Sequence, residues 1–302
     1  MKVATIDIGT NTILMLIVKL NENKNYEIIR QEFATPRLGE GIDKSGIISE
    51  IAIERSQQVL SNYKSIIDEL KVDKVITNAT SAMRDAKNNM VVKGIFETIL
   101  DSEVEIISGE SEAYFSYLGG VPTTEKSALI DIGGGSTEIM IGENNKIIFR
   151  KSFQIGAVRL TERFFNNNSP IDLNSLKAAN TFLTGLLKNE PINLSNLEMY
   201  SVAGTPCSLA TASKGLFDYE IEKVHNTKLY KNDIKVLLDN FYKMKSIDIS
   251  EKYKINSKRA DVITAGGLIL YSFLDYFNLD YTIVSSKGLR FGILQNFINS
   301  IK

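Results

Sequence analysis

Apolar residues follow two patterns along this chain: short β-branched runs, and longer stretches in which they recur at helical spacing. Near the N-terminus, two apolar runs at residues 3–8 and 13–18 are separated by the tetrapeptide GTNT, and residues 26–33 form a third run. Runs of this length bounded by turn residues predict strands. Residues 127–132 and 138–142 flank a second glycine turn in the same way, and the strand-like octapeptide KIIFRKSF follows them. The sequence therefore predicts the same three-stranded meander twice.

Predicted helices alternate with strands through the first half of the chain. Ser49 is placed to cap a helix that continues to about Leu70, because apolar residues recur at helical spacing between the two. Residues 72–88 then predict a strand, a loop and the start of a helix, and residues 104–120 repeat that order with a Ser-Gly break. This alternation favours an α/β domain.

The second half of the chain shows a similar alternation. Strands are predicted at residues 199–204 and 281–286, and an amphipathic helix over residues 288–300 closes the pattern. The apolar face of that last helix predicts that it returns to pack on the first domain. Other helices are predicted at residues 157–166, 172–188, 231–244 and 258–277.

A Gly-Gly-Val-Pro break at residues 119–122 marks the predicted domain boundary. We expect a first domain of residues 1–121 plus 290–302 and a second domain of residues 122–289. A length of 302 residues is sufficient for two domains. The repeated meander predicts two related α/β domains that face each other across a cleft.

Composition indicates a soluble globular protein, with 43% hydrophobic and 24% charged residues. A net charge of −1 and a pI of 6.1 provide no global field that would draw the protein onto nucleic acid or a membrane surface, so neither is an expected partner. Cys207 and His225 are the single cysteine and histidine, which excludes an internal disulfide, a cysteine-clustered zinc site and a site of several histidines. The N-terminal run contains Asp7 and Asn11, which argues against a signal peptide or membrane span, and we expect a cytoplasmic protein.

The two glycine turns share one chemical plan. In ATIDIGTNTILMLIV and in LIDIGGGSTEIMIG, an Asp precedes Ile-Gly and hydroxyl residues follow shortly after. Glycines without Cβ atoms let an anion approach the backbone N–H groups of such a turn, and the hydroxyls add further donors. An ordinary tight hairpin is the alternative, but the repetition favours phosphate binding. The predicted phosphate contacts are Gly9, Thr10, Asn11 and Thr12 in the first turn, and Gly133, Gly134, Gly135, Ser136 and Thr137 in the second.

A series of segments along the chain resembles one known family in content and order. They are DIGTNTILMLIV, RLGEGIDKSGIIS, ATSAMRDAKN, IISGESEAYFSYLG, DIGGGSTEIMIG, QIGAVRLTERFF, AGTPCSLATA, RADVITAGGLIL and SSKGLRFGIL. Their order is similar to that of the exopolyphosphatase/guanosine pentaphosphate phosphohydrolase (Ppx/GppA) family of the actin-like ATPase superfamily. The resemblance extends from Met1 almost to Lys302. It implies two actin-like ATPase (ribonuclease H-like) domains and hydrolysis of a terminal phosphoryl group rather than phosphorylation of a sugar.

The resemblance places the catalytic glutamate at Glu112, where it would orient and deprotonate the attacking water. In the first turn of a helix, the helix dipole would favour the ionised carboxylate. The alternative is that Glu110 and Glu112 are ordinary charges at a helix N-terminus. Arg84 is the expected phosphate clamp, because a guanidinium can contact phosphate oxygens in bidentate fashion. Its alternative is a surface ion pair with Asp85 or another acid.

The metal-linked carboxylates of the family correspond to Asp131 and Glu138, and Asp7 is the matching acid of the first domain. Glu138 alternates with the apolar Ile139 and Ile141, so we expect it to point into the cleft while they face a core, with an ordinary solvent-facing strand residue as the alternative. Mg²⁺ is the expected ion, because oxygen ligands and phosphate suit it and softer ligands are missing.

Other candidate contacts come from residue type and local pattern. AGTPCSLATA has the strand–Gly–Thr–helix form of a nucleotide-side turn, so Gly204 and Thr205 are candidate phosphate contacts, with a structural helix start as the alternative. Gly266 and Gly267 are costly in a helix, and close packing or a helix break would each account for them. Candidate polyanion contacts, each with a solvated surface charge as its alternative, are Arg37, Arg159, Lys287 and Arg290.

The chain departs from the family pattern at two positions. Ser111 stands where relatives often carry the first of two glutamates, and Lys287 stands close to where many carry an acid. The consequence of Ser111 for rate or pH dependence is open. Longer members of the family carry a C-terminal helical domain, and the resemblance of this sequence is to the short two-domain type.

The expected function is Mg²⁺-dependent release of terminal phosphate from inorganic polyphosphate, from guanosine pentaphosphate (pppGpp), or from both. One alternative is a phosphotransferase similar to acetate or sugar kinases, and another is a non-catalytic sensor of polyphosphate or guanosine alarmones. Substrate preference, chain-length preference and oligomeric state stay open, with a homodimer among the alternatives.

Overall fold

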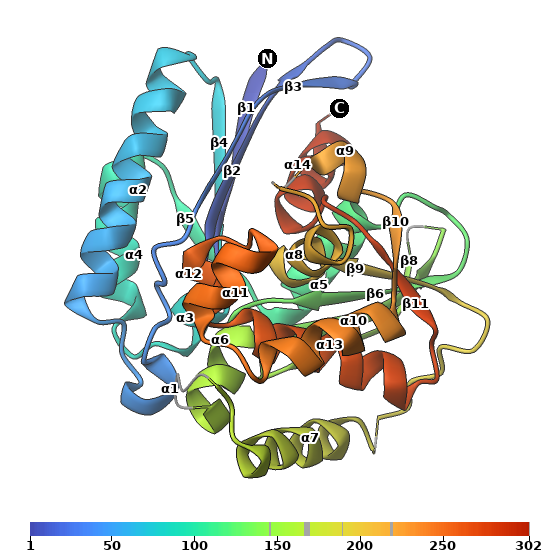
Figure 1. Cartoon of the computed structure of the whole chain (residues 1–302). Coiled ribbons are helices and arrows are strands. Elements are labelled where there is room, and N and C mark those ends of the chain that lie inside the picture. Colours follow the sequence, from blue (N-terminus) through green and yellow to red (C-terminus); the bar gives the residue numbers. More distant parts are fainter. Residues whose placement is uncertain (145, 166–169, 189, 218–219, 302) are drawn as a thin grey trace. The chain divides into compact units, whose positions relative to one another are not determined.

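The computed structural model describes residues 1–144, 146–165, 170–188, 190–217 and 220–301 (Figure 1). The chain divides into two compact units: unit 1 comprises Met1–Gly119 and Leu289–Lys302, and unit 2 comprises Gly120–Gly288. Each unit contains one sheet flanked by helices, which confirms the predicted α/β class. The cleft between the domains stays a prediction. Within the described ranges, every helix is too short or too polar to cross a membrane.

Unit 1 contains a five-stranded sheet with the strand order β3-β2-β1-β4-β5. Strands β1 to β3 form the antiparallel meander predicted from the N-terminal apolar runs, and β4 and β5 run parallel to β1. The carboxyl ends of β1, β4 and β5 therefore lie at the same edge, which is where parallel strands place functional groups. The strands are β1 (Lys2–Ile8), β2 (Ile13–Leu20), β3 (Tyr26–Ala34), β4 (Lys74–Ala79) and β5 (Val104–Ile106).

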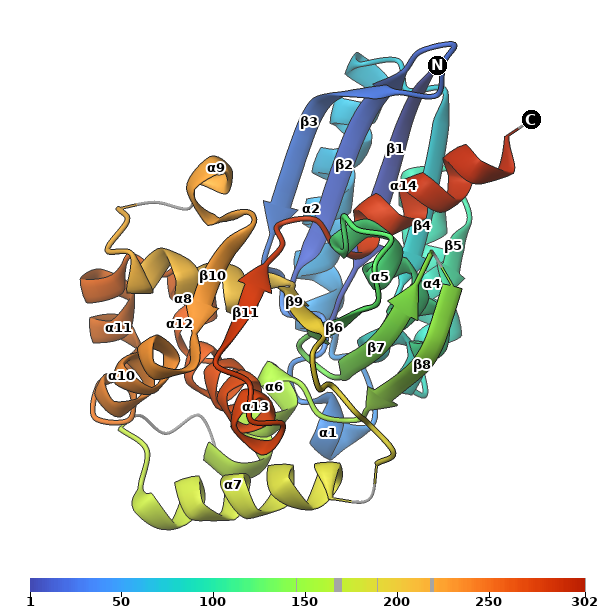
Figure 2. The same ribbon diagram turned by 90° about the vertical axis from the view of Figure 1, so that its right-hand side faces the viewer.

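Helices cover both faces of the unit 1 sheet, with α14 in front of it and α2 behind it in Figure 2. Because side chains alternate along a strand, Ile6 packs with α2 and α4, whereas Val3 packs with Leu294 of α14. Gly292 of α14 lies against the backbone of Phe115 in α5, so the last helix packs on unit 1. The helices of this unit are α1 (Ile42–Ser45), α2 (Glu50–Glu69), α3 (Ser81–Asp85), α4 (Asn89–Leu100), α5 (Gly109–Gly120) and α14 (Leu289–Ser300).

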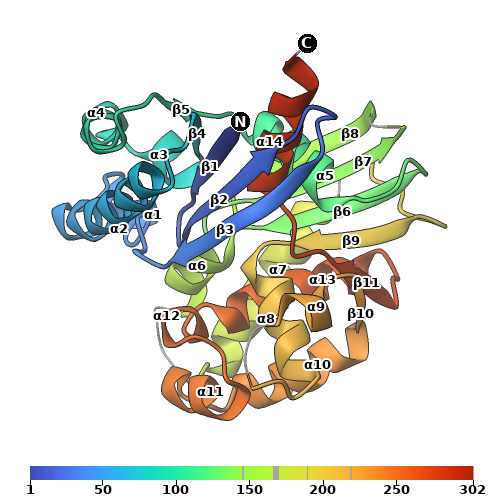
Figure 3. The ribbon, with the colours of Figure 1, turned by 90° about the horizontal axis from the view of Figure 1, so that it is seen from above.

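Unit 2 contains a six-stranded sheet with the order β10-β11-β9-β6-β7-β8 (Figure 3). Strands β6 to β8 form the second predicted meander, and β9 and β11 continue in parallel from β6. These five strands repeat the order and directions of unit 1, and β10 adds an antiparallel edge. The strands are β6 (Ser127–Ile132), β7 (Thr137–Glu143), β8 (Lys146–Phe153), β9 (Glu198–Val202), β10 (Thr227–Tyr230) and β11 (Tyr281–Val284).

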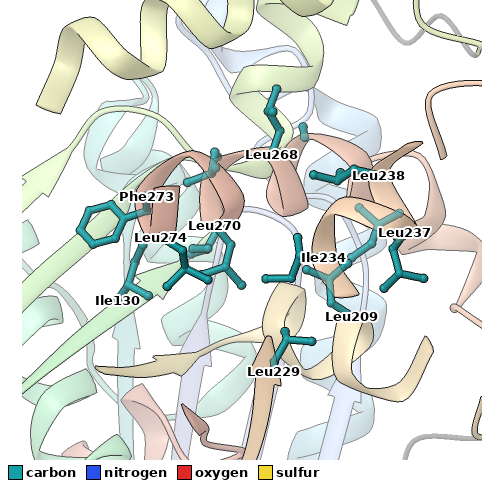
Figure 4. Close-up of a cluster of buried hydrophobic side chains, with 14 of the residues drawn as sticks. Ile130, Leu209, Leu229, Ile234, Leu237, Leu238, Leu268, Leu270, Phe273 and Leu274 are labelled. Atoms are coloured by element: carbon teal, nitrogen blue, oxygen red, sulfur yellow. The ribbon is translucent and has the colours of Figure 1, made fainter. Parts of the chain in front are cut away.

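The core of unit 2 centres on the buried helix α13 (Figure 4). Leu270 and Leu274 of this helix are fully buried in one cluster with Leu209 of α8, Ile234 of α10 and Ile130 of β6. A helix that is apolar around most of its surface is typical of such a central position. The helices are α6 (Ala157–Leu160), a π-helix (Thr161–Phe165), α7 (Leu173–Leu187), α8 (Gly204–Ser213), α9 (Ile221–Val224), α10 (Lys231–Phe241), α11 (Ser246–Tyr253), α12 (Ser257–Ala260) and α13 (Ile263–Tyr276).

Several predicted elements differ from the observed ones. The predicted helix over residues 258–277 is two helices, because the chain turns after Arg259, whose carbonyl accepts a hydrogen bond from the Val262 amide at 3.1 Å. The predicted helix over residues 157–166 is α6 followed by the π-helix, and residue 166 lies outside the described residues. Strand β10 and helix α11 were not predicted, because each presents a single buried anchor, Leu229 and Ile249, in an otherwise more exposed segment.

Candidate active site

The first glycine turn joins β1 to β2 and is closed by a short hydrogen bond. Ile8 and Ile13 are paired across the hairpin, and the Gly9 amide donates to the Thr12 carbonyl at 3.0 Å. A Cβ on Gly9 would lie 2.9 Å from that carbonyl oxygen, so this closure requires glycine. Two other carbonyls of the turn also accept hydrogen bonds, since Thr10 O accepts from Gly39 N at 2.8 Å and Asn11 O accepts from Arg37 N at 3.1 Å.

The second glycine turn, between β6 and β7, has the same geometry. The Gly133 amide donates to the Ser136 carbonyl at 3.0 Å, and a Cβ on Gly133 would lie 3.1 Å from that oxygen. Two carbonyls of the turn again accept hydrogen bonds from a segment that lies behind the turn. We call residues 37–39 the backing segment of the first turn and residues 156–158 the backing segment of the second. Gly133 O accepts from Ala157 N at 2.9 Å, and Gly134 O accepts from Val158 N at 2.9 Å. The repetition seen in the sequence therefore extends to the hydrogen bonds of the two turns.

The donor groups of both turns are left available, in contrast to their carbonyls. Within the described part of the chain, the backbone amides of Thr10, Asn11, Gly134 and Gly135 donate no hydrogen bond. The side-chain oxygens Thr10 Oγ1, Asn11 Oδ1 and Ser136 Oγ are buried and have no hydrogen-bond partner there either. Buried polar groups normally find partners, so unpaired groups at each of the two turns indicate a ligand at each. The amide and hydroxyl donors of these turns suit an anion such as phosphate, whereas Asn11 Oδ1 is an acceptor and needs a donor.

Thr12 and Thr137 complete the predicted phosphate contacts, and they have structural roles in the two turns. The Thr12 carbonyl closes the first turn. The Thr137 hydroxyl donates to the Ile155 carbonyl at 2.6 Å and is buried. This hydroxyl therefore holds the start of β7 against the segment that follows β8.

Glu112 lies in the first turn of α5, and Arg84 of α3 holds its carboxylate. Arg84 Nη1 donates to Glu112 Oε2 at 3.1 Å and to the Ile107 carbonyl at 2.9 Å. The Glu112 side chain is only 9% exposed. Arg84 Nη2 is buried and has no partner among the described residues, so the guanidinium retains a donor for a second anion. The sequence left open an ion pair of Arg84 with Asp85 or another acid. The structure pairs Arg84 with Glu112, and Asp85 is exposed on α3.

The N-terminus of α5 is capped by a pair of serines. Ser108 Oγ accepts a hydrogen bond from the Ser111 amide at 3.1 Å and lies 3.0 Å from Ser111 Oγ. Ser111 occupies the third helical position, where a glutamate would return a bond to the cap in a capping box. Here the Ser111 side chain contacts the hydroxyl of Ser108 instead of its backbone amide. Glu110, in the same helical turn, is exposed, so the two acids of this turn have different environments.

Asp131 and Glu138 are directly paired across the β6–β7 hairpin. Their side chains share one face of the sheet and are 8% and 0% exposed, whereas Ile139 lies in the core on the opposite face. Ser152 Oγ of β8 donates to Glu138 Oε1 at 2.6 Å and orients that carboxylate. Two buried carboxylates in opposite positions repel one another, and a cation would offset that repulsion.

The matching acid of unit 1 has a different neighbour. Asp7 is paired with Leu14 on β2 and lies beside Asn78 on β4. Across the described residues of the chain, no group of three or more His, Cys, Asp or Glu side chains is arranged to hold a metal. Asp131 and Glu138 could supply two ligands, with water or phosphate oxygens at the other positions. That ligand set is the one magnesium usually has in phosphate-binding sites.

Gly204 and Thr205 begin α8 at the end of β9. The preceding Ala203 has φ 75° and ψ −171°, a conformation that only glycine adopts readily, and such strain often marks a functional turn. A Cβ on Gly204 would overlap the guanidinium of Arg259, and a Cβ on Gly266 would lie 2.8 Å from Thr205 Cγ2. Close packing therefore explains Gly266, and the sequence did not single out Arg259 because a lone arginine in a helical pattern carries no signal.

The four candidate polyanion contacts have partners of their own. Arg37, in the left-handed region at φ 58°, lies 3.7 Å from Glu40. Arg55 of α2, which was not predicted, donates to Glu40 at 2.7 Å and to the Arg37 carbonyl at 3.3 Å. Arg159 donates to the Gln154 side chain at 3.2 Å, Arg290 donates to Gln31 at 2.8 Å, and the backbone of Lys287 pairs with the Ser285 hydroxyl.

Cys207 and His225 have the structural roles that their isolation predicts. Cys207 is buried in α8. His225 Nδ1 accepts a hydrogen bond from the Ser286 amide at 3.2 Å, which requires the ring to be neutral. Burial, and then the charge of Lys287, lower the pKa of His225 below its usual value, so the neutral form is favoured.

Comparison with known proteins identifies similar sequences over almost the whole chain. The model of the Ppx/GppA phosphatase family matches residues 16–300. The chain is 34% identical to the bifunctional 3-dehydroquinate synthase/phosphatase of Fusobacterium nucleatum, over 96% of this chain but 46% of that protein. It is 28% identical to exopolyphosphatase 2 of Mycobacterium tuberculosis, over 89% of this chain and 88% of that protein. It is 27% identical to the guanosine-5'-triphosphate,3'-diphosphate pyrophosphatase of Pseudoalteromonas translucida, over 98% of this chain and 59% of that protein.

Solved structures show the same fold at similar sequence identity. The crystal structure of the Aquifex aeolicus Ppx/GppA family member superimposes with a TM-score of 0.83 at 31% identity, covering 100% of this chain and 99% of that one. The chain thus spans less than two thirds of some curated relatives, and nearly all of this structural neighbour.

Proposed function

This chain belongs to the Ppx/GppA phosphatase family, and we propose that it is a Mg²⁺-dependent phosphohydrolase that releases the terminal phosphate of inorganic polyphosphate, of pppGpp, or of both. The observation that carries this proposal is the buried Glu112 held by Arg84, whose second guanidinium nitrogen has no partner among the described residues. A phosphate-binding turn serves kinases as well as hydrolases. A positioned carboxylate beside a phosphate-binding arginine is what attack by water additionally requires.

Glu112 would act as the general base. Arg84 holds its carboxylate at Oε2, and a carboxylate positioned in this way can accept a proton from water. The adjacent guanidinium and the N-terminus of α5 both favour the ionised form that a proton acceptor needs. Arg84 would contact the terminal phosphate through Nη2 while Nη1 keeps Glu112 and the Ile107 carbonyl in place. One side chain would thereby set the distance between base and phosphate.

The glycine turns would hold phosphate oxygens through hydrogen bonds that need no titrating group. Amides of Thr10 and Asn11 in unit 1, and of Gly134 and Gly135 in unit 2, are the proposed donors. The hydroxyls of Thr10 and Ser136 add to them. Such preorganised donors stabilise charge on transferring phosphoryl oxygens without reorganisation during the reaction.

Magnesium is proposed at Asp131 and Glu138 of unit 2. Both are carboxylates, both are nearly buried, and they lie opposite one another on adjacent strands. When bound there, Mg²⁺ would neutralise charge on the phosphate oxygens. The Ser152 hydroxyl would keep Glu138 Oε1 oriented, and Asp7 is the corresponding acid of unit 1.

The proposed substrates follow from the names of the relatives. One is an exopolyphosphatase and another is a guanosine-5'-triphosphate,3'-diphosphate pyrophosphatase. Both names describe cleavage of a phosphoric anhydride at a terminal phosphate. The geometry of Glu112 and Arg84 serves either substrate, because it concerns only the group that is released.

The test compares Glu112→Gln with Glu110→Gln. Both acids lie in the first turn of α5, but Glu112 is buried and Glu110 is exposed. Phosphate release from polyphosphate and from pppGpp is measured with Mg²⁺ and with excess EDTA. We expect Glu112→Gln to lower kcat by about 10²–10⁴-fold, because the amide cannot accept the proton, and Glu110→Gln to retain activity.

Three outcomes would contradict the proposal. Equal activity of Glu112→Gln and the wild type would show that Glu112 is not the general base. Tight binding of either substrate without turnover in the wild type would indicate a sensor. Transfer of phosphate from ATP to an added acceptor, in place of hydrolysis, would indicate a phosphotransferase.

A further inference from the structure

Gly39 lies behind the first phosphate turn and touches it at two points. Its amide donates to the Thr10 carbonyl at 2.8 Å. A Cβ added at Gly39 would overlap the Thr10 Cγ2 methyl and lie 3.2 Å from the Ala82 Cβ. The residue is buried, and its φ lies outside the left-handed region that favours glycine. Gly39 is therefore needed for space rather than for backbone freedom.

The contact with Gly39 sets the direction of the Thr10 hydroxyl. Threonine carries its methyl and hydroxyl on one tetrahedral Cβ, so fixing one fixes the other. With the methyl packed on Gly39, Oγ1 takes another position on the Thr10 Cβ, where it is buried and has no partner among the described residues. The hydrogen bond at the Thr10 carbonyl has the same effect on the backbone, because it turns the carbonyl toward Gly39 and leaves the adjacent amides available.

Unit 2 also has a glycine packed behind its glycine turn. A Cβ at Gly156 would lie 2.5 Å from the carbonyl carbon and oxygen of Gly134 and 2.6 Å from Gly133 O. The next two amides, of Ala157 and Val158, donate to those carbonyls. Gly39 and Gly156 each follow the third strand of their meander, after Ala34 and Phe153. The internal repeat thus includes a backing glycine for each turn.

We propose that Gly39 is a positioning residue for phosphate binding, which acts through Thr10 by giving room to its methyl and holding its carbonyl, and that Gly156 gives room to the carbonyls of Gly133 and Gly134. The inference rests on the proposed function, because it concerns the donors that would hold the phosphate. Neither glycine touches the phosphate. Each glycine would keep the carbonyls of its turn directed toward the backing segment, so that the amide and hydroxyl donors face the phosphate.

The experiment uses a cycle of Gly39→Ala and Thr10→Ser, with Gly94→Ala as control. Serine keeps the hydroxyl and lacks the methyl, so it removes the overlap with an alanine at position 39 and leaves the nearest remaining contacts at 3.2 Å and 3.3 Å. Gly94 has nothing within 4 Å of an added Cβ. All proteins carry Glu112→Gln, so that inorganic tripolyphosphate, the probe, is not consumed. Its Kd is measured by calorimetry with Mg²⁺, and urea unfolding checks each fold.

We expect Gly39→Ala to raise the Kd by about tenfold or more, the usual effect of losing a hydrogen bond to a charged group. The double variant should bind as tightly as Thr10→Ser alone, and Gly94→Ala should bind as its parent does. A merely structural role for Gly39 would change stability without this rescue of affinity. Thr10→Val, which keeps the methyl and loses the hydroxyl, should also weaken binding while the fold persists, so the idea is testable even where Gly39→Ala unfolds.

Each opposing result has a distinct meaning. Unchanged affinity in Gly39→Ala or in Thr10→Val overturns the positioning role, and so does a failure of Thr10→Ser to rescue Gly39→Ala. Absence of tripolyphosphate binding in the Glu112→Gln parent, together with absence of hydrolysis in the wild type, overturns the proposed function itself.

Discussion

At the scale of single residues, Arg84 shows how one side chain serves two tasks. Its Nη1 atom bridges Glu112 and the Ile107 carbonyl, and its Nη2 atom is left for another anion. A guanidinium can do both because its donors are fixed in one plane and point in different directions. The sequence predicted Arg84 as a phosphate clamp, but its contact with Glu112 depends on two segments separated by 28 positions.

Replacing Arg84 by lysine keeps the positive charge but removes the planar guanidinium, whose nitrogens donate in different directions. The single ammonium of Lys cannot hold Glu112, the Ile107 carbonyl and a phosphate at once, so we expect kcat/KM for polyphosphate to fall by about tenfold or more. Arg30→Lys is the matched control, since Arg30 is an exposed arginine on β3 that pairs with Glu32. Phosphate release at saturating and limiting substrate gives both constants. Equal losses in the two variants would contradict a special role for Arg84.

At the scale of elements, two serine helix caps have different consequences for the site. Ser49 Oγ accepts from the Ala52 amide at the start of α2, as the sequence predicted, and Ser108 Oγ accepts from the Ser111 amide at the start of α5. Both satisfy an amide that the first helical turn leaves open. Only α5 carries Glu112, so only its cap positions the proposed base.

Ser49→Ala and Ser108→Ala should therefore separate stability from activity. Loss of either cap costs about 1 kcal/mol of helix stability. We expect a similar fall in the free energy of unfolding, measured in urea, for both variants. Ser108→Ala should in addition lower kcat, because the first turn of α5 frays around Glu112. A kcat that is equal in the two variants would show that the cap of α5 has no part in placing the base.

At the scale of the whole molecule, the end of the chain stabilises the beginning. Helix α14 contributes Leu294 to a cluster with Val3, Leu16 and Val18, and these residues are almost completely buried. The Thr5 hydroxyl on β1 also donates to the Arg290 carbonyl at 3.0 Å. Unit 1 is therefore assembled from two segments separated by the whole of unit 2.

This arrangement predicts which unit loses stability when a core residue is replaced. Leu294→Ala should lower the stability of unit 1 by about 2–5 kcal/mol through the cavity it leaves. Amide hydrogen exchange should then quicken in β1 and β2. Leu270→Ala, at a fully buried position of α13, should have that effect in unit 2 instead. The inference about α14 fails if Leu294→Ala leaves exchange in β1 and β2 unchanged.

Much of this protein could be predicted from local sequence. The apolar runs around GTNT and GGGS predicted two hairpins, and the period of apolar residues after Ser49 predicted α2, because these signals arise between residues close in the chain. The division of residues 258–277 into two helices was not predicted, because apolar residues continue on both sides of the turn at Asp261. Strand β10 was missed because one buried residue, Leu229, does not make a periodic pattern.

The sequence by itself determined the repeated meanders, the glycine turns and the residue types available for phosphate and magnesium, because strand period and turn chemistry are properties of neighbouring residues. Only the tertiary structure decided which partners those residues have. The pairing of Arg84 with Glu112, the packing of Gly39 on Thr10 and the return of α14 to β1 all join distant segments. They depend on burial and close packing in three dimensions, which the order of residues in one chain does not reveal.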